Sequence, residues 1–256
     1  MVMSTLTAYE TIKVDLQGPV CHLQIDRPEA NNTINAQLIE ECHDALDACE
    51  ESATVVVLSG SPEVFCYGAD FKALAGRSNE GPVPPGPLYD LWHRLATGPY
   101  VTVSHVRGRA NAGGVGFVAA SDIVLADETA QFSLSELLFG LYPACVLPFL
   151  TRRIGFQKAH YLTLMAQPIS AKQALEWGLV DAVETPGEAL LRRHLQRLRR
   201  LSKTAVRRYK RYMGRIGAPL GELKQAAVDG NLEVFSDPAN LQAITRYVEH
   251  GLFPWE

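Results

Sequence analysis

The chain has 256 residues, of which 47% are hydrophobic and 20% are charged, and its formal net charge is −4. These values are typical of a soluble globular protein, and without a run of about 18 apolar residues no membrane span is predicted. The five cysteines are scattered, which indicates free thiols in a reducing cytoplasm, and no cysteine or histidine cluster has metal-site spacing. We therefore expect a cytoplasmic protein without a bound metal.

The N-terminal part of the chain predicts strands and one helix. Residues 9–26 alternate loosely and predict two strands separated by a turn at Gln17–Pro19. Apolar residues recur at helical spacing over Asn35–Glu50, which predicts an amphipathic helix. The apolar, β-branched run Val55–Leu58 predicts a buried strand directly after it.

Two glycine-containing turns, Phe65–Phe71 and Asn111–Phe117, are the most informative segments. We expect them to follow the strands Val55–Leu58 and Val101–Val106, and each leads into a helix-like pattern. Two helix N-termini on neighbouring strands direct backbone N–H groups at one point and so stabilise negative charge on a carbonyl oxygen. The alternative is a pair of ordinary strand-to-helix turns, in which glycine serves only the backbone geometry.

The rest of the chain becomes increasingly helical. A helix is expected over Leu88–Ala96 and a strand over Asp122–Ala126, and Ser170 and Gly178 are expected to begin and end a further helix. Three more helical regions are predicted, over residues 187–213, 218–235 and 238–250. Strands that alternate with helices indicate an α/β core with crossover connections, here residues 1–190, followed by a helical region, residues 191–256.

An ordered set of motifs identifies a family resemblance. The set comprises Ile25–Asn32, the two glycine turns, Ser121–Ala126, Phe132–Glu136, Gly140–Pro143 and Gly178–Asp181. In this order it resembles the crotonase (enoyl-CoA hydratase/isomerase) superfamily. The resemblance implies a crotonase-like fold, in which repeated ββα units form the core and C-terminal helices contact other subunits and close the active site. It also implies a homo-oligomer, either a trimer or a hexamer.

The same resemblance assigns site residues by position. It places the oxyanion-hole N–H groups on Ala69 and Gly113, with the neighbouring Gly68 and Gly114 at the substrate. Hydratases of the superfamily use two glutamates, and this chain has Gly116 at the first position and Glu136 at the second. Glu136 is therefore the expected acid/base, and ordinary two-glutamate hydration is not expected.

Further matching segments indicate a subgroup. These are Cys66–Phe71, Tyr89–Trp92, Asn111–Asp122, Phe132–Cys145 and Phe253–Glu256. They resemble the 3-hydroxy-3-methylglutaryl-ACP dehydratases of polyketide β-branching cassettes. The resemblance implies that Glu136 removes the C2 proton and returns a proton to the leaving hydroxyl, giving 3-methylglutaconyl-ACP. No cofactor is implied, since the substrate is carried on the phosphopantetheine of an acyl carrier protein or on CoA.

Three alternative functions remain open at this point. The first is a hydratase or isomerase acting on free CoA thioesters, and the second is the partner decarboxylase of the same cassette. The third is an RNA-binding protein on the same scaffold, which is less expected than a carrier-protein partner. The retained Glu136 favours dehydration over decarboxylation, because elimination needs a base and loss of carbon dioxide does not.

Several residues are candidates for binding the substrate or for a second proton transfer. Lys72 and Arg77 are candidates for the terminal carboxylate of the substrate, and Lys72 or Arg27 for the pantetheine or nucleotide end of the carrier. Tyr142 is a further candidate for substrate binding. A second acid, or a structural role, is open for His105, Tyr142, Asp70 and His250.

The segment Arg192–Arg215 contains eleven lysine or arginine residues and no acidic residue. It is either a solvated helix face or a docking surface for an anionic partner such as an acyl carrier protein. Leu195, Leu198 and Leu201 are expected to face the core, which leaves Arg197 and Arg200 outside as docking residues.

Overall fold

The computed structural model describes residues 9–76 and 83–256, and its first half repeats the order strand, strand, helix. In chain order the four units are β1 (Ile12–Gln17), β2 (Val20–Ile25) and α1 (Ala36–Cys49); β3 (Val55–Ser59), β4 (Val64–Cys66) and α2 (Phe71–Leu74); β5 (Val101–Val106), β6 (Arg109–Asn111) and α4 (Gly113–Ala120); and β7 (Ile123–Ala126), β8 (Gln131–Ser133) and the short helix η2 (Glu136–Phe139). Helix α3 (Pro85–Thr97) lies between the second and third units. The predicted core of ββα units is confirmed.

The strands form two sheets. The larger has the order β1-β2-β3-β5-β7-β10 and the smaller β4-β6-β8-β9, where β9 is Ile169–Ser170 and β10 is Ala182–Val183. Pairing is antiparallel for β1 with β2 and for β8 with β9, and parallel elsewhere. From the second unit onward, the first strand of each unit joins the larger sheet and the second joins the smaller. The glycine turns therefore leave the smaller sheet.

Strands β4 and β6 correct the predicted origin of the glycine turns. The turns were expected to follow β3 and β5 directly, but three-residue strands lie between. These strands are parallel neighbours, with Val64 opposite Arg109 and Cys66 opposite Ala110. The two turns thus do lie on neighbouring strands, as predicted, although on strands too short for a periodic pattern to reveal.

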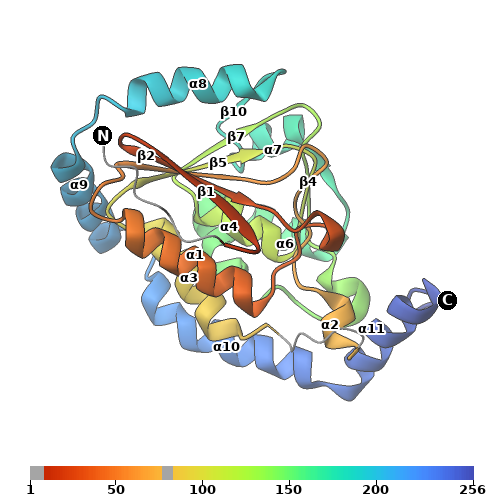
Figure 1. Cartoon of the computed structure of the whole chain (residues 1–256). Helices are drawn as coiled ribbons and strands as arrows, with labels where there is room; N and C mark the ends of the chain where they lie inside the picture. The colour runs from red at the N-terminus through yellow and green to blue at the C-terminus, as the bar shows by residue number, and fades with distance from the viewer. Residues whose placement is uncertain (1–8, 77–82) are drawn as a thin grey trace.

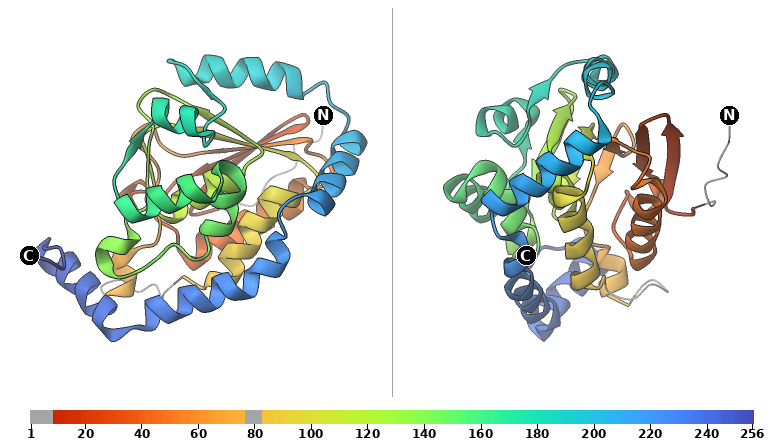
Figure 2. Two further views of the ribbon diagram at one scale, coloured as in Figure 1. Left: turned by 180° about the vertical axis from the view of Figure 1, so that it is seen from behind. Right: turned by 90° about the vertical axis from the view of Figure 1, so that its left-hand side faces the viewer.

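The larger sheet has an apolar layer on each face. Val56 and Leu58 of β3 belong to the main core, while the alternate residues Val55 and Val57 pack with Leu190 and other leucines of α8 (Gly187–Leu198). In Figure 1 α8 lies above the sheet, and α10 and α11 lie at the opposite side of the molecule; the left view of Figure 2 shows the same arrangement from behind.

The C-terminal half is mostly helical, as predicted. Its helices are α5 (Leu147–Ile154), α6 (Phe156–Met165), α7 (Ala171–Trp177), α8, α9 (Lys203–Ile216), α10 (Leu220–Ser236) and α11 (Pro238–His250). Ser170 caps α7 by accepting the Gln173 N–H, and Gly178 ends it with φ 79°, which confirms both predicted boundaries. Among the helices of the described ranges, none combines the length and apolar character needed to cross a membrane.

The predicted helical region 187–213 is in fact two helices. The chain turns at residues 199–202, and the Ser202 hydroxyl caps α9 by accepting the Ala205 N–H. This turn breaks the expected leucine stripe: Leu195 and Leu198 are buried, but Leu201 is 42% exposed. The basic segment is also not wholly external, since Lys210 is buried and its Nζ lies 2.5 Å from Asp122.

Candidate active site

A cavity of about 1260 Å³ lies between the two glycine turns, η2 and the C-terminal helices. Ala69, Gly113 and Glu136 all line it, so the structure brings the three predicted catalytic residues to one space. Phe139 of η2 and Tyr247 of α11 have ring centroids 5.1 Å apart, which ties the C-terminal helix to this side of the cavity. The predicted boundary at residue 190 stays a prediction, but residues beyond it help to enclose the site.

The two turns lie directly against each other. Gly68 has φ +88°, a left-handed conformation that favours glycine, and a Cβ there would lie 2.6 Å from the Ala112 Cβ and 3.1 Å from the Gly113 nitrogen. The backbones flanking the turns are fixed by hydrogen bonds, from the Ile34 N–H to the Gly68 carbonyl and from the Ala112 N–H to the Ser133 carbonyl. The glycine thus allows a close approach of the two loops.

The backbone N–H groups of Ala69 and Gly113 are available for a ligand. Neither donates a hydrogen bond to an acceptor in residues 9–76 or 83–256. Gly113 is the first residue of α4, where the helix dipole is positive and the first N–H groups have no partner within the helix. Two such donors beside one cavity form a candidate oxyanion hole for a thioester carbonyl.

Glu136 is a buried carboxyl group in the wall of the cavity. It begins η2, is 6% exposed, and its Oε2 has no hydrogen-bond partner among the described residues. Burial raises its pKa from 4.5 to about 7, although the backbone N–H groups of Glu136 and Ser135 act in the opposite direction. A carboxyl group with this pKa exchanges a proton readily near neutral pH, as a general acid/base must.

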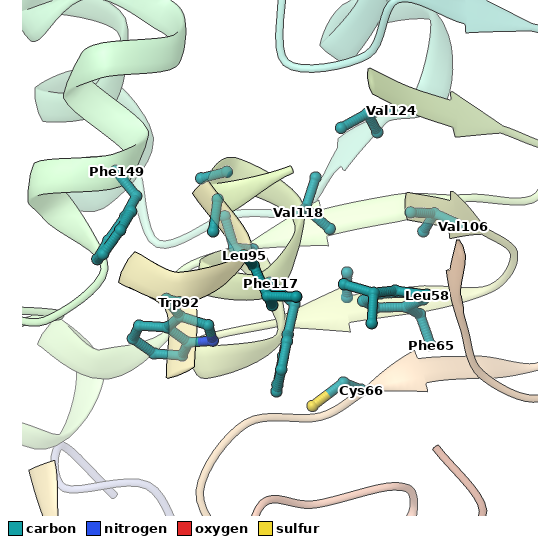
Figure 3. Packing of buried hydrophobic residues seen from close by; sticks show 14 of the residues in the cluster. Leu58, Phe65, Cys66, Trp92, Leu95, Val106, Phe117, Val118, Val124 and Phe149 are labelled. Carbon is teal, nitrogen blue, oxygen red and sulfur yellow. The ribbon is translucent and has the colours of Figure 1, made fainter. Parts of the chain in front are cut away.

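Trp92 occupies the space beside Gly116. A Cβ at Gly116 would lie 2.5 Å from Cζ2 of the indole, so no larger side chain fits there without moving the ring. Trp92 is 1% exposed and is held between Phe117 and Phe149, whose ring centroids lie 5.9 and 6.0 Å from its own (Figure 3). The missing first glutamate is therefore not replaced by another carboxylate, but by a tryptophan that also lines the cavity.

The remaining predicted binding residues are placed differently. Lys72 is exposed and lines both the cavity and a smaller surface pocket formed with residues of α11, which puts it at the mouth. Tyr142 lines the cavity and donates a 3.1 Å hydrogen bond to Glu233. Gly68 and Gly114 are not among the residues that line it, and both are closely packed against neighbouring backbone, so their role at the substrate stays a prediction. Arg77 lies outside the described residues.

The other candidates for acid or ligand roles have structural partners. Asp70 caps α2 by accepting the Lys72 N–H at 2.9 Å. The Arg27 guanidinium donates to the Thr33 carbonyl at 2.7 Å and so holds the loop before Ile34. His105 is buried and faces Gly187 at the start of α8, and burial lowers the pKa of its imidazole. Of the candidates for a second acid, His105 thus lies away from the cavity, whereas Asp70 directly follows Ala69 and lines the cavity with its carboxylate engaged in capping α2.

Arg197 and Arg200 are exposed, but the structure does not bring them to the cavity. Arg197 belongs to α8, which packs on the face of the larger sheet away from the main core and from the cavity-lining Trp92. Arg200 follows in the turn after α8. Their docking role stays a prediction that the position of α8 does not favour.

Polar side chains that the sequence analysis missed line the cavity next to Glu136. Asn111, Ser133 and Ser135 are joined by hydrogen bonds of 2.7 and 3.0 Å, and Arg109 lies two residues before Asn111 on the same strand. The available signal was the strand alternation around Ala110, which puts Arg109 and Asn111 on one face.

Comparisons with known proteins identify relatives of the whole chain. The chain is 58% identical over 98% of its length to the bacillaene synthase dehydratase PksH of Bacillus subtilis, of which it covers 98%. The crystal structure of the Bacillus subtilis pksH protein matches with a TM-score of 0.93, covering 96% of this chain and 100% of that one. An enoyl-CoA hydratase from Mycobacterium avium subsp. paratuberculosis matches with a TM-score of 0.82 at 25% identity, covering 94% of this chain and 97% of the other.

These structures confirm the predicted crotonase-like fold. The family model for enoyl-CoA hydratase/isomerase matches residues 15–256, nearly the whole chain. With the family's turns, its second glutamate and its fold in place, the chain belongs to the enoyl-CoA hydratase/isomerase family.

Proposed function

We propose that this enzyme is a hydro-lyase that converts 3-hydroxy-3-methylglutaryl-ACP to 3-methylglutaconyl-ACP in polyketide β-branching. The observation that carries the proposal is the buried Glu136 carboxylate beside the two glycine turns, whose Oε2 has no hydrogen-bond partner among the described residues, with Trp92 in the place of a second carboxylate. The 58% identity to a protein named as a polyketide synthase dehydratase supports the same reaction type.

The proposed reaction begins at C2 of the acyl group. The ionised Glu136 carboxylate takes the C2 proton, while the Ala69 and Gly113 N–H groups donate to the thioester oxygen as it becomes an enolate. The enolate then re-forms the carbonyl, the C2=C3 bond forms and the C3–O bond breaks. The protonated Glu136 gives its proton to the departing hydroxyl, which leaves as water. Glu136 ends as the carboxylate, so the cycle balances without a cofactor.

One carboxyl group can perform both transfers only if both reacting groups lie on the same face of the substrate. The other carboxylates that line the described cavity are Glu29, which is exposed, and Asp70, which caps α2. Neither is placed as a second acid/base. We therefore assign both proton transfers to Glu136.

The carrier and the assembly are also part of the proposal. The acyl group is carried on the phosphopantetheine of an acyl carrier protein, with Lys72 at the mouth of the cavity. Helix α6 exposes Phe156 (69%) and Leu164 (58%), and such apolar side chains support assembly into a homotrimer or a hexamer. Light scattering coupled to size-exclusion chromatography distinguishes these states from a monomer.

The pH dependence of dehydration tests the role of Glu136. The base must be ionised in the free enzyme, and burial places its pKa at about 7. We expect kcat/KM for 3-hydroxy-3-methylglutaryl-pantetheine, followed by absorbance of the conjugated product, to rise through about pH 7. A profile that stays flat from about pH 5.5 to about pH 8.5, or faster turnover of a straight-chain enoyl-CoA than of this substrate, would refute the proposal.

A further inference from the structure

The cavity wall next to Glu136 contains a row of polar side chains from strands β6 and β8. Strands β6 and β8 are paired in parallel, with Arg109 opposite Gln131 and Asn111 opposite Ser133. The residues between them, Ala110 and Phe132, are fully buried in the main core, so alternation directs the other four to the cavity side. All four line the cavity.

Asn111, in this row, is hydrogen-bonded to Ser133 of the same row and to the neighbouring Ser135. The Ser133 hydroxyl donates to Asn111 Oδ1 at 2.7 Å, and Asn111 Nδ2 donates to the Ser135 hydroxyl at 3.0 Å. Ser135 directly precedes Glu136. Asn111 Nδ2 also donates to the Tyr67 carbonyl at 3.4 Å, so these side chains are held in place on the cavity wall.

Arg109, at the start of β6, has a side chain without a partner among the described residues. Its guanidinium makes no hydrogen bond or ion pair with any residue in the ranges 9–76 and 83–256, whereas its backbone is fixed by a bond from its N–H to the Glu63 carbonyl. By contrast, Arg107, two residues earlier, is paired with Glu188. An unpaired guanidinium on a cavity wall has the planar donor pair that matches a carboxylate.

The two cations of the described cavity lie in different places. Lys72 follows the first glycine turn and also lines the surface pocket beside α11, at the mouth of the cavity. Arg109 begins the strand that leads into the second glycine turn, and alternate residues of a strand are only about 6.6 Å apart. A short acyl chain held at Ala69 and Gly113 reaches Arg109 if it extends along Asn111.

From this arrangement we infer that Arg109 binds the distal carboxylate of the acyl group, with Asn111, Ser133 and Ser135 as the polar floor of that subsite. The inference rests on the proposed function for the identity of the acyl group. It assigns the carboxylate to Arg109 in place of Lys72 and Arg77, which the sequence had suggested. Selection of an acyl group with an anionic end over an alkyl chain follows from this subsite.

Binding measurements test the subsite without requiring turnover. Glutaryl-pantetheine has the distal carboxylate but no 3-hydroxyl, so it cannot undergo dehydration, and its carboxamide analogue lacks the charge. By titration calorimetry we expect the wild type to bind the carboxylate about 10- to 30-fold more tightly than the amide. Arg109→Gln should remove this preference, while Arg107→Gln, which breaks an ion pair outside the cavity, should keep it.

The competing explanations give different results. If Lys72 holds the carboxylate, Lys72→Gln abolishes the preference and Arg109→Gln keeps it, which overturns the inference. If Arg109 is a contact between copies of the chain, Arg109→Gln changes the elution volume in size-exclusion chromatography and weakens both ligands equally, which also overturns it. An intact preference in a wild type that fails to dehydrate 3-hydroxy-3-methylglutaryl-pantetheine would refute the proposed function and support the subsite.

Discussion

Replacing Glu136 by glutamine should inactivate the enzyme and, at alkaline pH, stabilise its fold. The carboxyl group is buried with a pKa of about 7 in place of 4.5, so the folded state binds its proton more tightly than the unfolded state does. Ionisation of Glu136 therefore destabilises the folded state. The full destabilisation is present above about pH 7, and almost none is present below about pH 4.5. Each pKa unit corresponds to about 1.4 kcal/mol, which limits the cost to about 3 kcal/mol.

The comparison of two pH values isolates this effect, because the packing of glutamine is the same at both. We compare the free energy of unfolding of Glu136→Gln with that of the wild type. This difference should shift in favour of the variant by about 2 to 3 kcal/mol between about pH 5 and about pH 8.5. Urea titrations followed by circular dichroism measure it. At the same time, kcat should fall about 100- to 10,000-fold, since glutamine cannot transfer the proton.

Glu128→Gln is the matched control, because Glu128 is exposed and its side chain has no hydrogen bond to the rest of the described chain. It should change neither kcat nor the pH dependence of stability. Near-normal turnover of Glu136→Gln would refute the catalytic assignment. A stability difference that is the same at both pH values would refute the buried, pKa-shifted carboxyl group.

Three further predictions concern the turns, the tryptophan and the basic segment. Gly113→Val should lower kcat/KM at least 10-fold, because a side chain there blocks the N–H, and should lower the melting temperature less, because Gly113 is not among the positive-φ glycines. A large loss of melting temperature with normal specific activity contradicts this. Gly116→Glu should lower the free energy of unfolding by roughly 1–3 kcal/mol, since its Cβ would meet the indole. In a Trp92→Ala background the same change should cost less, and an equal cost in both backgrounds would contradict the steric cause. The double variant Arg197→Glu/Arg200→Glu should turn over carrier-bound and pantetheine-linked substrates within about twofold of the wild type, because α8 lies across the sheet from the cavity. A loss confined to the carrier-bound substrate would support a docking role for the two arginines.

Long periodic elements could be predicted from the sequence because each carries its own pattern. Helix α1 and strand β3 follow their apolar spacing, and α7 begins and ends at its cap residues Ser170 and Gly178. Strands of three residues, such as β4, have no periodicity to detect, so the second sheet was missed. The turn between α8 and α9 was also missed, although Ser202 is a recognisable N-cap within the basic run.

The residues of the candidate site also fall into those that the sequence could predict and those that it could not. Ala69, Gly113 and Glu136 lie in motifs that carry a family resemblance, and the structure brings them to one cavity. Arg109 lies in no such motif, and the matching segment Tyr89–Trp92 gives Trp92 no role in the site. Trp92 is informative only once the helices α3 and α4 are packed together, and Arg109 only once β6 is paired with β8.

Intact-protein mass spectrometry of 3-hydroxy-3-methylglutaryl acyl carrier protein, after incubation with this enzyme, tests the central claim most directly. We predict that the carrier-bound acyl group loses the mass of one water, and that Glu136→Gln leaves the substrate unchanged over the same time. Loss of the mass of carbon dioxide, or an unchanged substrate with the wild-type enzyme, would contradict the proposed dehydration.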